Sequence, residues 1–275
     1  MPEPLPPLLL ATAIEAVIRA GDVQMQHFGG ALQVDKKGAI DLVTNIDVEI
    51  ERAFRATIAE RFPDHAVLGE EFANVEEDRL PKYCWVFDPI DGTTNYAHGL
   101  PIFCSSLSLE IDGEAVAGAV YDPSRRELFT AERGHGAWLN GQPLRVSSSA
   151  ALIDSLLVTG FPYTVQQDPG ELVGVFTEFL KTSRAVRRLG SAALDLCYVA
   201  AGRFDGFWEQ KLNPWDISAG ALIVQEAGGT VTDTAGQPFR ARGGNIIASN
   251  GGVHQAMVET IQGFRQRFRS RNWTE

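Results

Sequence analysis

The chain is poor in cysteine, with only Cys84, Cys104 and Cys197 among its 275 residues. Their number is odd, they lie far apart in the sequence, and no Cys-x-x-Cys pair occurs. This pattern argues against a disulfide framework or a zinc knuckle, and we expect a reducing compartment, the cytoplasm. The five histidines also lack a paired ligand spacing such as His-Glu-x-x-His.

Long apolar runs and basic residues are scarce as well. The N-terminal apolar stretch follows Glu3, is interrupted by Glu15 and contains no Lys or Arg before Arg19. A signal peptide begins with basic residues and a membrane span needs about 20 apolar residues. We therefore expect an amphipathic first helix and no membrane partner.

The net charge of −11 has two consequences. Nucleic-acid backbones bind Lys and Arg, so a nucleic-acid partner is not expected over most of the chain. The surplus of acids fits either a solvated acidic surface or a site that collects divalent cations. Composition alone does not decide between the two.

Two common catalytic signatures are absent, the Gly-x-Ser-x-Gly elbow and the Walker A lysine motif. The chain does contain 44% apolar residues and only 21% charged residues. Such a composition excludes widespread disorder and allows a sizeable core, as one large domain or two lobes.

The apolar patterns predict two halves of different character. In the first half we expect helices near 7–28 and 45–61, strands at 66–69 and 83–88, a hairpin of strands 105–112 and 114–122, a strand at 127–132 and turns across 134–141. In the second half we expect strands at 155–160, 185–188, 205–209, 229–233 and 245–249, and helices at 170–182, 192–201, 215–227 and 253–268.

The hairpins of the first half predict an α+β arrangement, and the alternating strands and helices of the second predict an α/β layered sheet. No repeat and no low-complexity linker separates the halves. We therefore expect one domain over residues 1–275, with two lobes of about 1–146 and 147–275.

The stretch DPIDGTTN, residues 88–95, carries the clearest chemistry. An apolar strand ends in Asp88, Pro89 forces a turn, and Asp91 returns close to Asp88. Gly92 lets backbone N–H groups approach an anion, and Thr93 can begin a helix whose N-terminus favours phosphate. The same eight residues also fit an ordinary strand-to-helix turn with Asp and Thr as caps.

A cation is the missing partner in this stretch. Two close carboxylates beside a phosphate repel each other, and the motif contains no Lys or Arg. A divalent metal is therefore predicted, and oxygen ligands favour Mg²⁺ over Zn²⁺.

Four motifs together resemble those of the inositol monophosphatase family. They are DPIDGTTN, followed by Tyr96 where the family has Phe, the stretch WDISAGALIVQEAGG at 215–229, GEE at 69–71 and DLVTNID at 41–47. The resemblance covers essentially the whole chain. It implies a layered α-β-α-β-α sandwich, the sugar-phosphatase fold shared with fructose-1,6-bisphosphatase. It also implies a bacterial-type, homodimeric, Li⁺-sensitive phosphatase with two or three Mg²⁺ per site.

The resemblance assigns the metal ligands. It implies that Glu70, Asp88 and the backbone carbonyl of Ile90 hold the first metal. Asp88, Asp91 and Asp216 would hold the second. Taken without the resemblance, Glu70 reads as a solvated acid at a strand end, and Asp216 reads as a helix cap.

The resemblance also assigns catalytic and substrate-binding residues. Asp47 is expected to hydrogen-bond Thr93, and together with Glu70 they would orient and deprotonate a water bound to the metal. Lys36 is a further candidate at the family's active-site lysine position, although a solvated loop lysine explains it as well. The expected substrate-binding residues are Gly92, Thr93, Thr94, Gly190, Ser191, Ala192, Glu209 and Asp216.

The substrate expected from these residues is myo-inositol 1-phosphate, with related inositol monophosphates. Relatives that hydrolyse 3′-phosphoadenosine 5′-phosphate or histidinol phosphate usually have Lys after Asp-Gly-Thr, where this chain has Thr94. Glu209 points the same way, because a carboxylate accepts hydroxyl protons. Those two substrates and fructose 1,6-bisphosphate remain alternatives.

A function without catalysis is the second alternative, and it comes from the C-terminal stretch FRQRFRSRNWTE. Its arginines, Arg265, Arg267, Arg269 and Arg271, interleave with Phe264, Phe268 and Trp273. A basic aromatic tail can bind RNA or an acidic protein. Arginines also suit a helix C-terminus, and phenylalanines one helical turn apart fit a helix packed on the body.

Overall fold

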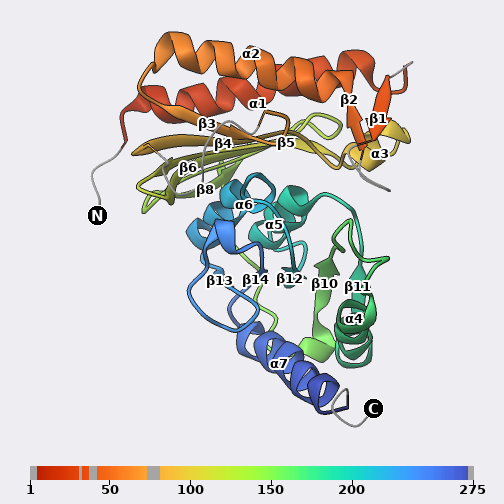
Figure 1. Ribbon diagram of the computed structural model, residues 1–275. Helices are drawn as coiled ribbons and strands as arrows, with labels where there is room; N and C mark the ends of the chain where they lie inside the picture. The colour runs from red at the N-terminus through yellow and green to blue at the C-terminus, as the bar shows by residue number, and fades with distance from the viewer. Residues whose placement is uncertain (1–4, 31–32, 37–41, 73–80, 272–275) are drawn as a thin grey trace.

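The computed structural model has five layers in the order helix, sheet, helix, sheet, helix (Figure 1). It describes residues 5–30, 33–36, 42–72 and 81–271. The layers of helices are α1 (Pro7–His27) and α2 (Asn45–Arg61), then α5 (Ala192–Ala200) and α6 (Pro214–Glu226), then α4 (Gly170–Thr182) and α7 (His254–Arg271). The expected layered α-β-α-β-α architecture is confirmed.

The first sheet has seven strands in the order β3-β4-β5-β6-β7-β8-β9. These are β3 (Ala66–Gly69), β4 (Tyr83–Asp91), β5 (Cys104–Ile111), β6 (Glu114–Asp122), β7 (Glu127–Glu132), β8 (Gly136–Leu139) and β9 (Gln142–Pro143). Only β3 and β4 pair in parallel, and the other neighbours are antiparallel. The predicted hairpin is present, and Asp112 and Gly113 both have positive φ, as its two-residue turn requires.

Three expectations for the first half need correction. Strand β8 occupies the region where only turns were predicted, and β9 directly after it was not predicted. A small antiparallel pair, β1 (Val34–Lys36) with β2 (Leu42–Thr44), was not predicted either. Strand β4 also continues past Asp88 to Asp91. The pairing with β5 shifts its register between these two aspartates, where Pro89 has no N–H to donate to the ladder.

The second sheet has five strands in the order β11-β10-β12-β14-β13. They are β10 (Leu156–Thr159), β11 (Ala185–Arg187), β12 (Gly206–Glu209), β13 (Thr230–Thr232) and β14 (Ile246–Ser249). Strand β10 pairs in parallel with β11 and β12, whereas β14 pairs antiparallel with β12 and β13. Each strand and helix predicted for this half is present, and two short 3₁₀ helices (Leu152–Asp154 and Ala241–Gly243) are additional.

The middle layer of helices joins the two sheets through one apolar core. Val120 and Phe129 of the first sheet share this core with Leu196 of α5 and Ile217 of α6. Each fully buried side chain of this size contributes about 1.5–3 kcal/mol of transfer free energy. Gly220 lets α5 and α6 approach closely, because a Cβ there would lie 2.7 Å from the Leu196 side chain.

Helix α7 packs along α4 and uses most of the basic aromatic stretch to do so. The rings of Phe264 and Phe268 stack with centroids 5.5 Å apart, and they lie over glycines of α4. Arg265 pairs with a glutamate of α4 at 2.7 Å, and Arg267 pairs with another at 2.8 Å. Arg269 is exposed, whereas Trp273 lies outside the described residues. The expectation that these phenylalanines pack on the body is confirmed.

Within the described residues, no helix combines the length and apolar character that crossing a membrane requires.

Candidate active site

One cavity of about 440 Å³ gathers most of the predicted site residues at the boundary of the two halves. Its lining includes Glu70, Asp88, Ile90, Asp91, Gly92, Thr93, Thr94, Gly190, Ser191, Ala192, Glu209 and Asp216. The predicted residues therefore come from the ends of β3, β4 and β12 and from the starts of α3, α5 and α6. Asp47 does not line the cavity but lies directly behind Thr93, and the side chain of Lys36 is outside the described part of the structure.

Asp88 lies among the other carboxylates of the cavity. Its side chain is buried and accepts the Ile90 N–H at 2.9 Å. Burial raises the pKa of Asp88 well above its ordinary value, and the charges of Glu70, Asp91 and Asp216 raise it further. The cluster is therefore short of positive charge.

Asp91 ties the strand β4 to the start of α5. Its Oδ2 accepts the Ser191 hydroxyl and the Ala193 N–H, both at 2.7 Å. Burial raises the pKa of Asp91 to about 6, although the hydrogen bonds from Ser191 and Ala193 oppose that rise. These contacts occupy Oδ2 and fix the orientation of the carboxylate.

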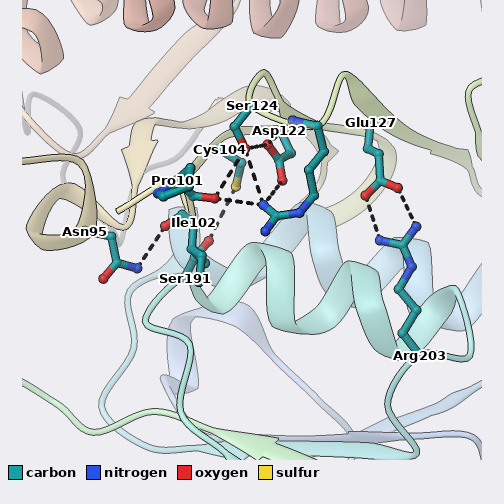
Figure 2. Close-up of polar contacts among 10 residues, drawn as sticks. Asn95, Pro101, Ile102, Cys104, Asp122, Ser124, Glu127, Ser191 and Arg203 are labelled. Atoms are coloured by element: carbon teal, nitrogen blue, oxygen red, sulfur yellow. Dashed lines mark hydrogen bonds and ion pairs between the residues drawn. The ribbon is translucent and has the colours of Figure 1, made fainter. Parts of the chain in front are cut away.

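Asn95 extends the same connection, and Figure 2 shows its amide reaching the Ile102 carbonyl. Its amide donates to the carbonyl oxygens of Ile102, at 2.8 Å, and Leu189, at 2.9 Å. Helix α3 (Thr93–Ala97) is thereby held against the segment that leads into α5. Gly92, the N-cap of α3, has φ of 96° and would bring a Cβ within 2.9 Å of the Ile102 oxygen, so the turn requires glycine.

Asp216 lies in the first turn of α6 but is not its N-cap. The cap is Asn213, followed by Pro214, and the Asp216 carboxylate accepts the Asn213 N–H at 2.7 Å in a capping box. The alternative that Asp216 itself caps α6 is therefore wrong, because the cap is Asn213, three residues earlier. Burial raises the pKa of Asp216 well above its ordinary value, and the charges of Asp91 and Glu70 raise it further.

Thr93 and Asp47 form the expected hydrogen bond, at 3.3 Å between Oγ1 and Oδ1. The Thr93 hydroxyl also reaches the Ile90 carbonyl at 2.9 Å, so the two acceptors compete for one proton. The other oxygen of Asp47 accepts the N–H and the hydroxyl of Thr44, at 2.9 and 2.5 Å. Thr44 is the N-cap of α2. Asp47 is thus fully buried and oriented by its own helix.

Glu209 is the last residue of β12, and its side chain lines the cavity. Its carboxyl group packs over Gly160, where a Cβ would lie 2.2 Å from Oε2. Burial raises the pKa of Glu209 to about 8, while the charge of Arg188 lowers it and that of Asp91 raises it.

Three charged residues that the sequence analysis did not identify also line the cavity, namely Arg188, Asp195 and Lys211. Asp195 is buried, and its Oδ1 has no hydrogen-bond partner among the described residues. Four-residue spacing places Asp195 on the same face of α5 as Ser191, and that spacing could have identified it.

Glu209 predicts a dependence of stability on pH. Its pKa in the folded protein, about 8, exceeds the ordinary 4.5, so its stabilising contribution is complete below pH 4.5 and is lost as the pH rises through about 8. Glu209→Gln cannot ionise. As the pH rises through this window, the free energy of unfolding of the wild type should therefore fall relative to that of the variant, by up to ~1.4 kcal/mol per pH unit. Urea unfolding in chelating buffer across this window measures the difference, and a constant difference would contradict the prediction.

The cavity is a carboxylate-lined pocket rather than a closed shell of ligands. Among the residues that the structure describes, no three His, Cys, Asp or Glu side chains are grouped so that they could hold a metal ion as they stand. The protein's own hydrogen bonds engage one oxygen each of Asp88, Asp91 and Asp216. The arrangement offers hard oxygen atoms, excess negative charge and the N-terminus of α3 in one place.

Comparison with known proteins supports one family. The model of the inositol monophosphatase family matches residues 8–266. An inositol-1-monophosphatase of Synechocystis sp. is 44% identical over 94% of this chain and 91% of its own length. The Nus factor SuhB of Pseudomonas aeruginosa is 41% identical over 92% of this chain and 96% of its own. A solved inositol monophosphatase of Anabaena sp. has a TM-score of 0.84 at 38% identity, covering 93% of this chain and 96% of its own. With this match over most of its length and with its layered fold, the chain belongs to the inositol monophosphatase family.

Proposed function

We propose that the chain is a Mg²⁺-dependent phosphomonoesterase that hydrolyses myo-inositol 1-phosphate and related inositol monophosphates. The observation that carries the proposal is the convergence of Glu70, Asp88, Asp91 and Asp216 with Glu209 in one cavity. The first four suit cations, which would in turn bind a phosphate, and Glu209 suits a hydroxylated alcohol. The name of the Synechocystis relative supports the same substrate.

The donor set fits divalent cations of the hard type. The ligands would be Glu70, Asp88, Asp91, Asp216 and the Ile90 carbonyl, which are all oxygens, as Mg²⁺ prefers. Burial raises the pKa of Asp88, and the charges of Glu70, Asp91 and Asp216 raise it further, so a cation among these carboxylates would be favoured. Bound cations would neutralise the carboxylates, polarise the attacking water and offset the charge of the leaving oxygen.

The protein's own groups then bind the phosphate and move a proton. The N–H groups of Gly92, Thr93 and Thr94 lie at the start of α3, where helix N–H groups have no partner within the helix. They would receive the phosphate oxygens and support the charge that develops during in-line attack.

Proton transfer falls to Thr93 and Asp47. The Thr93 hydroxyl takes a proton from the attacking water as its own proton passes to the Asp47 carboxylate, 3.3 Å away. Glu70, at the end of β3, lines the same part of the cavity and would orient that water. No covalent intermediate is required by this arrangement.

The alcohol would lie against Glu209 and the segment Gly190–Ala192, which the Asn95 amide and the Asp91 carboxylate hold in place. Steady-state phosphate release from four esters tests the function. We expect the highest kcat/KM for myo-inositol 1-phosphate, above fructose 1,6-bisphosphate, histidinol phosphate and 3′-phosphoadenosine 5′-phosphate. A higher kcat/KM for any of the other three would replace the proposed substrate.

Glu209→Gln should reduce the preference for a hydroxylated alcohol. Unpaired hydroxyls cost about 1–3 kcal/mol, roughly 5–150-fold in kcat/KM for myo-inositol 1-phosphate. A small ester such as glycerol 2-phosphate should be affected much less. The ratio of the two kcat/KM values is the quantity to measure in wild type and variant. An unchanged ratio would show that Glu209 does not contact the alcohol.

Four further properties form part of the proposal. One catalytic domain spans the chain, with metal and phosphate motifs in one lobe and the substrate wall and second-metal ligand in the other. The core shared by the two lobes supports this organisation.

Three free, buried cysteines support a cytoplasmic location. Val173 and Leu180 are exposed apolar residues on α4 that would suit a homodimer contact. Inhibition by Li⁺ is proposed because the cation ligands are retained.

A further inference from the structure

Glu51 is a buried carboxylate in the middle of α2, far in sequence from the cavity motifs. Its Oε2 accepts the Glu71 N–H at 2.7 Å, and its Oε1 accepts the Phe72 N–H at 3.1 Å. These two N–H groups directly follow Glu70 in the chain. The carboxylate of Glu51 therefore holds the backbone on one side of Glu70.

Arg55, one helical turn further along α2, completes the arrangement. Its Nε donates to the Glu51 carboxylate at 2.8 Å, and one terminal nitrogen donates to the Val67 carbonyl at 3.1 Å. The other terminal nitrogen donates to the Phe72 carbonyl. Glu51 and Arg55 thus hydrogen-bond the backbone on both sides of Glu70, at Val67 of β3 and at residues 71–72.

Gly69 shows how closely this carboxylate approaches the backbone. A Cβ at Gly69 would lie 2.2 Å from Oε1 of Glu51 and 2.7 Å from Oε2. Such distances force an atom to move. Glycine before Glu70 is therefore needed for the carboxylate of Glu51 to sit under the turn.

We propose that Glu51 and Arg55 form a clamp that positions Glu70 for cation binding, so that Glu51 is a positioning residue of the metal site. The inference rests on the proposed function, in which Glu70 is a metal ligand. It requires no contact between Glu51 and the metal. Partners behind a ligand typically change metal affinity by about 10–100-fold when they are removed.

The direct test measures binding of Mn²⁺ alone to metal-free protein, with free Mn²⁺ followed by electron paramagnetic resonance. Mn²⁺ takes the same oxygen ligands as Mg²⁺. We expect Glu51→Gln to raise the Mn²⁺ dissociation constant about 10–100-fold. The Mg²⁺ concentration for half-maximal turnover should rise in parallel.

Two further variants separate position from charge. Glu51→Gln removes a negative charge, which alone weakens cation binding. Gly69→Ala and Arg55→Lys leave every charge in place but displace the carboxylate or break the fork of donors, so both should weaken Mn²⁺ binding as well. They also keep the test valid if Glu51→Gln does not fold.

Asp205→Asn is the matched control, because Asp205 is also a buried carboxylate that accepts a backbone N–H, that of Leu156, at 2.7 Å. It does not line the cavity. It should lower the melting temperature without changing Mn²⁺ affinity.

The outcomes distinguish the inference from the proposed function. Loss of Mn²⁺ affinity in Glu51→Gln and Gly69→Ala, but not in Asp205→Asn, supports the clamp. Wild-type affinity in both, with loss only in Glu70→Gln, overturns the clamp and leaves the metal site standing. Wild-type protein that binds no Mn²⁺ overturns the proposed function and the clamp together.

Discussion

Removal of divalent cations should abolish hydrolysis of myo-inositol 1-phosphate, and Mg²⁺ should restore it. Phosphate monoesters are so inert that enzymes lower their barrier by up to about 20 kcal/mol or more. Among the described residues, the lining of this cavity contains only two cationic side chains, Arg188 and Lys211, beside its carboxylates. The N–H groups of α3 do not offset the remaining negative charge. Without cations we therefore expect only background phosphate release.

The measurement is phosphate release after treatment with EDTA and removal of the chelator, followed by titration with Mg²⁺. Circular dichroism should show an intact fold in the metal-free state, since Asp91 and Asp216 are held by the protein's own hydrogen bonds. Mg²⁺ should also raise the melting temperature, because it relieves the repulsion around Asp88. Undiminished turnover by exhaustively metal-free protein would falsify the proposal.

Local sequence predicted the elements that have long periodic patterns and the site residues that lie within compact motifs. Asp88, Asp91 and Gly92 belong to one short stretch whose turn chemistry is legible from the residues alone. The expected hydrogen bond between Asp47 and Thr93 came from family resemblance instead, because 46 residues separate the two in the chain. The fold brings them together where α2 meets α3.

The failures have physical causes of two kinds. Strands β1 and β2 have three residues each, too few for a period to show. Strand β4 was ended at Asp88 because Pro89 breaks a ladder, yet a register shift absorbs the proline and the strand continues.

Glu51 was missed for another reason, which is that its partners are distant in sequence. On α2 it reads as an ordinary solvated acid, because its helical neighbours do not reveal that it is buried. Its hydrogen-bond donors lie 20 and 21 residues further along the chain. Only the hydrogen bonds formed where α2 packs near the end of β3 show that the carboxylate faces inward.

Loss of the Thr93 hydroxyl or of the Asp47 carboxylate should reduce kcat far more than it changes the Mg²⁺ requirement. Removing a catalytic proton-transfer partner typically costs about 10²–10⁴-fold. We expect Thr93→Ala and Asp47→Asn each to fall in that range at saturating Mg²⁺. Neither side chain is assigned as a metal ligand, so the half-saturating Mg²⁺ concentration should stay close to wild type.

The hydrogen bond between the two residues predicts how their effects combine. Groups that act as one unit are non-additive, so the double variant should be little worse than either single one. Thr93→Ser keeps the hydroxyl and should recover most of the activity. Asp205→Asn again serves as the control for a buried carboxylate outside the cavity. Full recovery of kcat in both single variants on raising Mg²⁺ would show that they act through metal binding. Fully additive losses would show that Thr93 and Asp47 work separately.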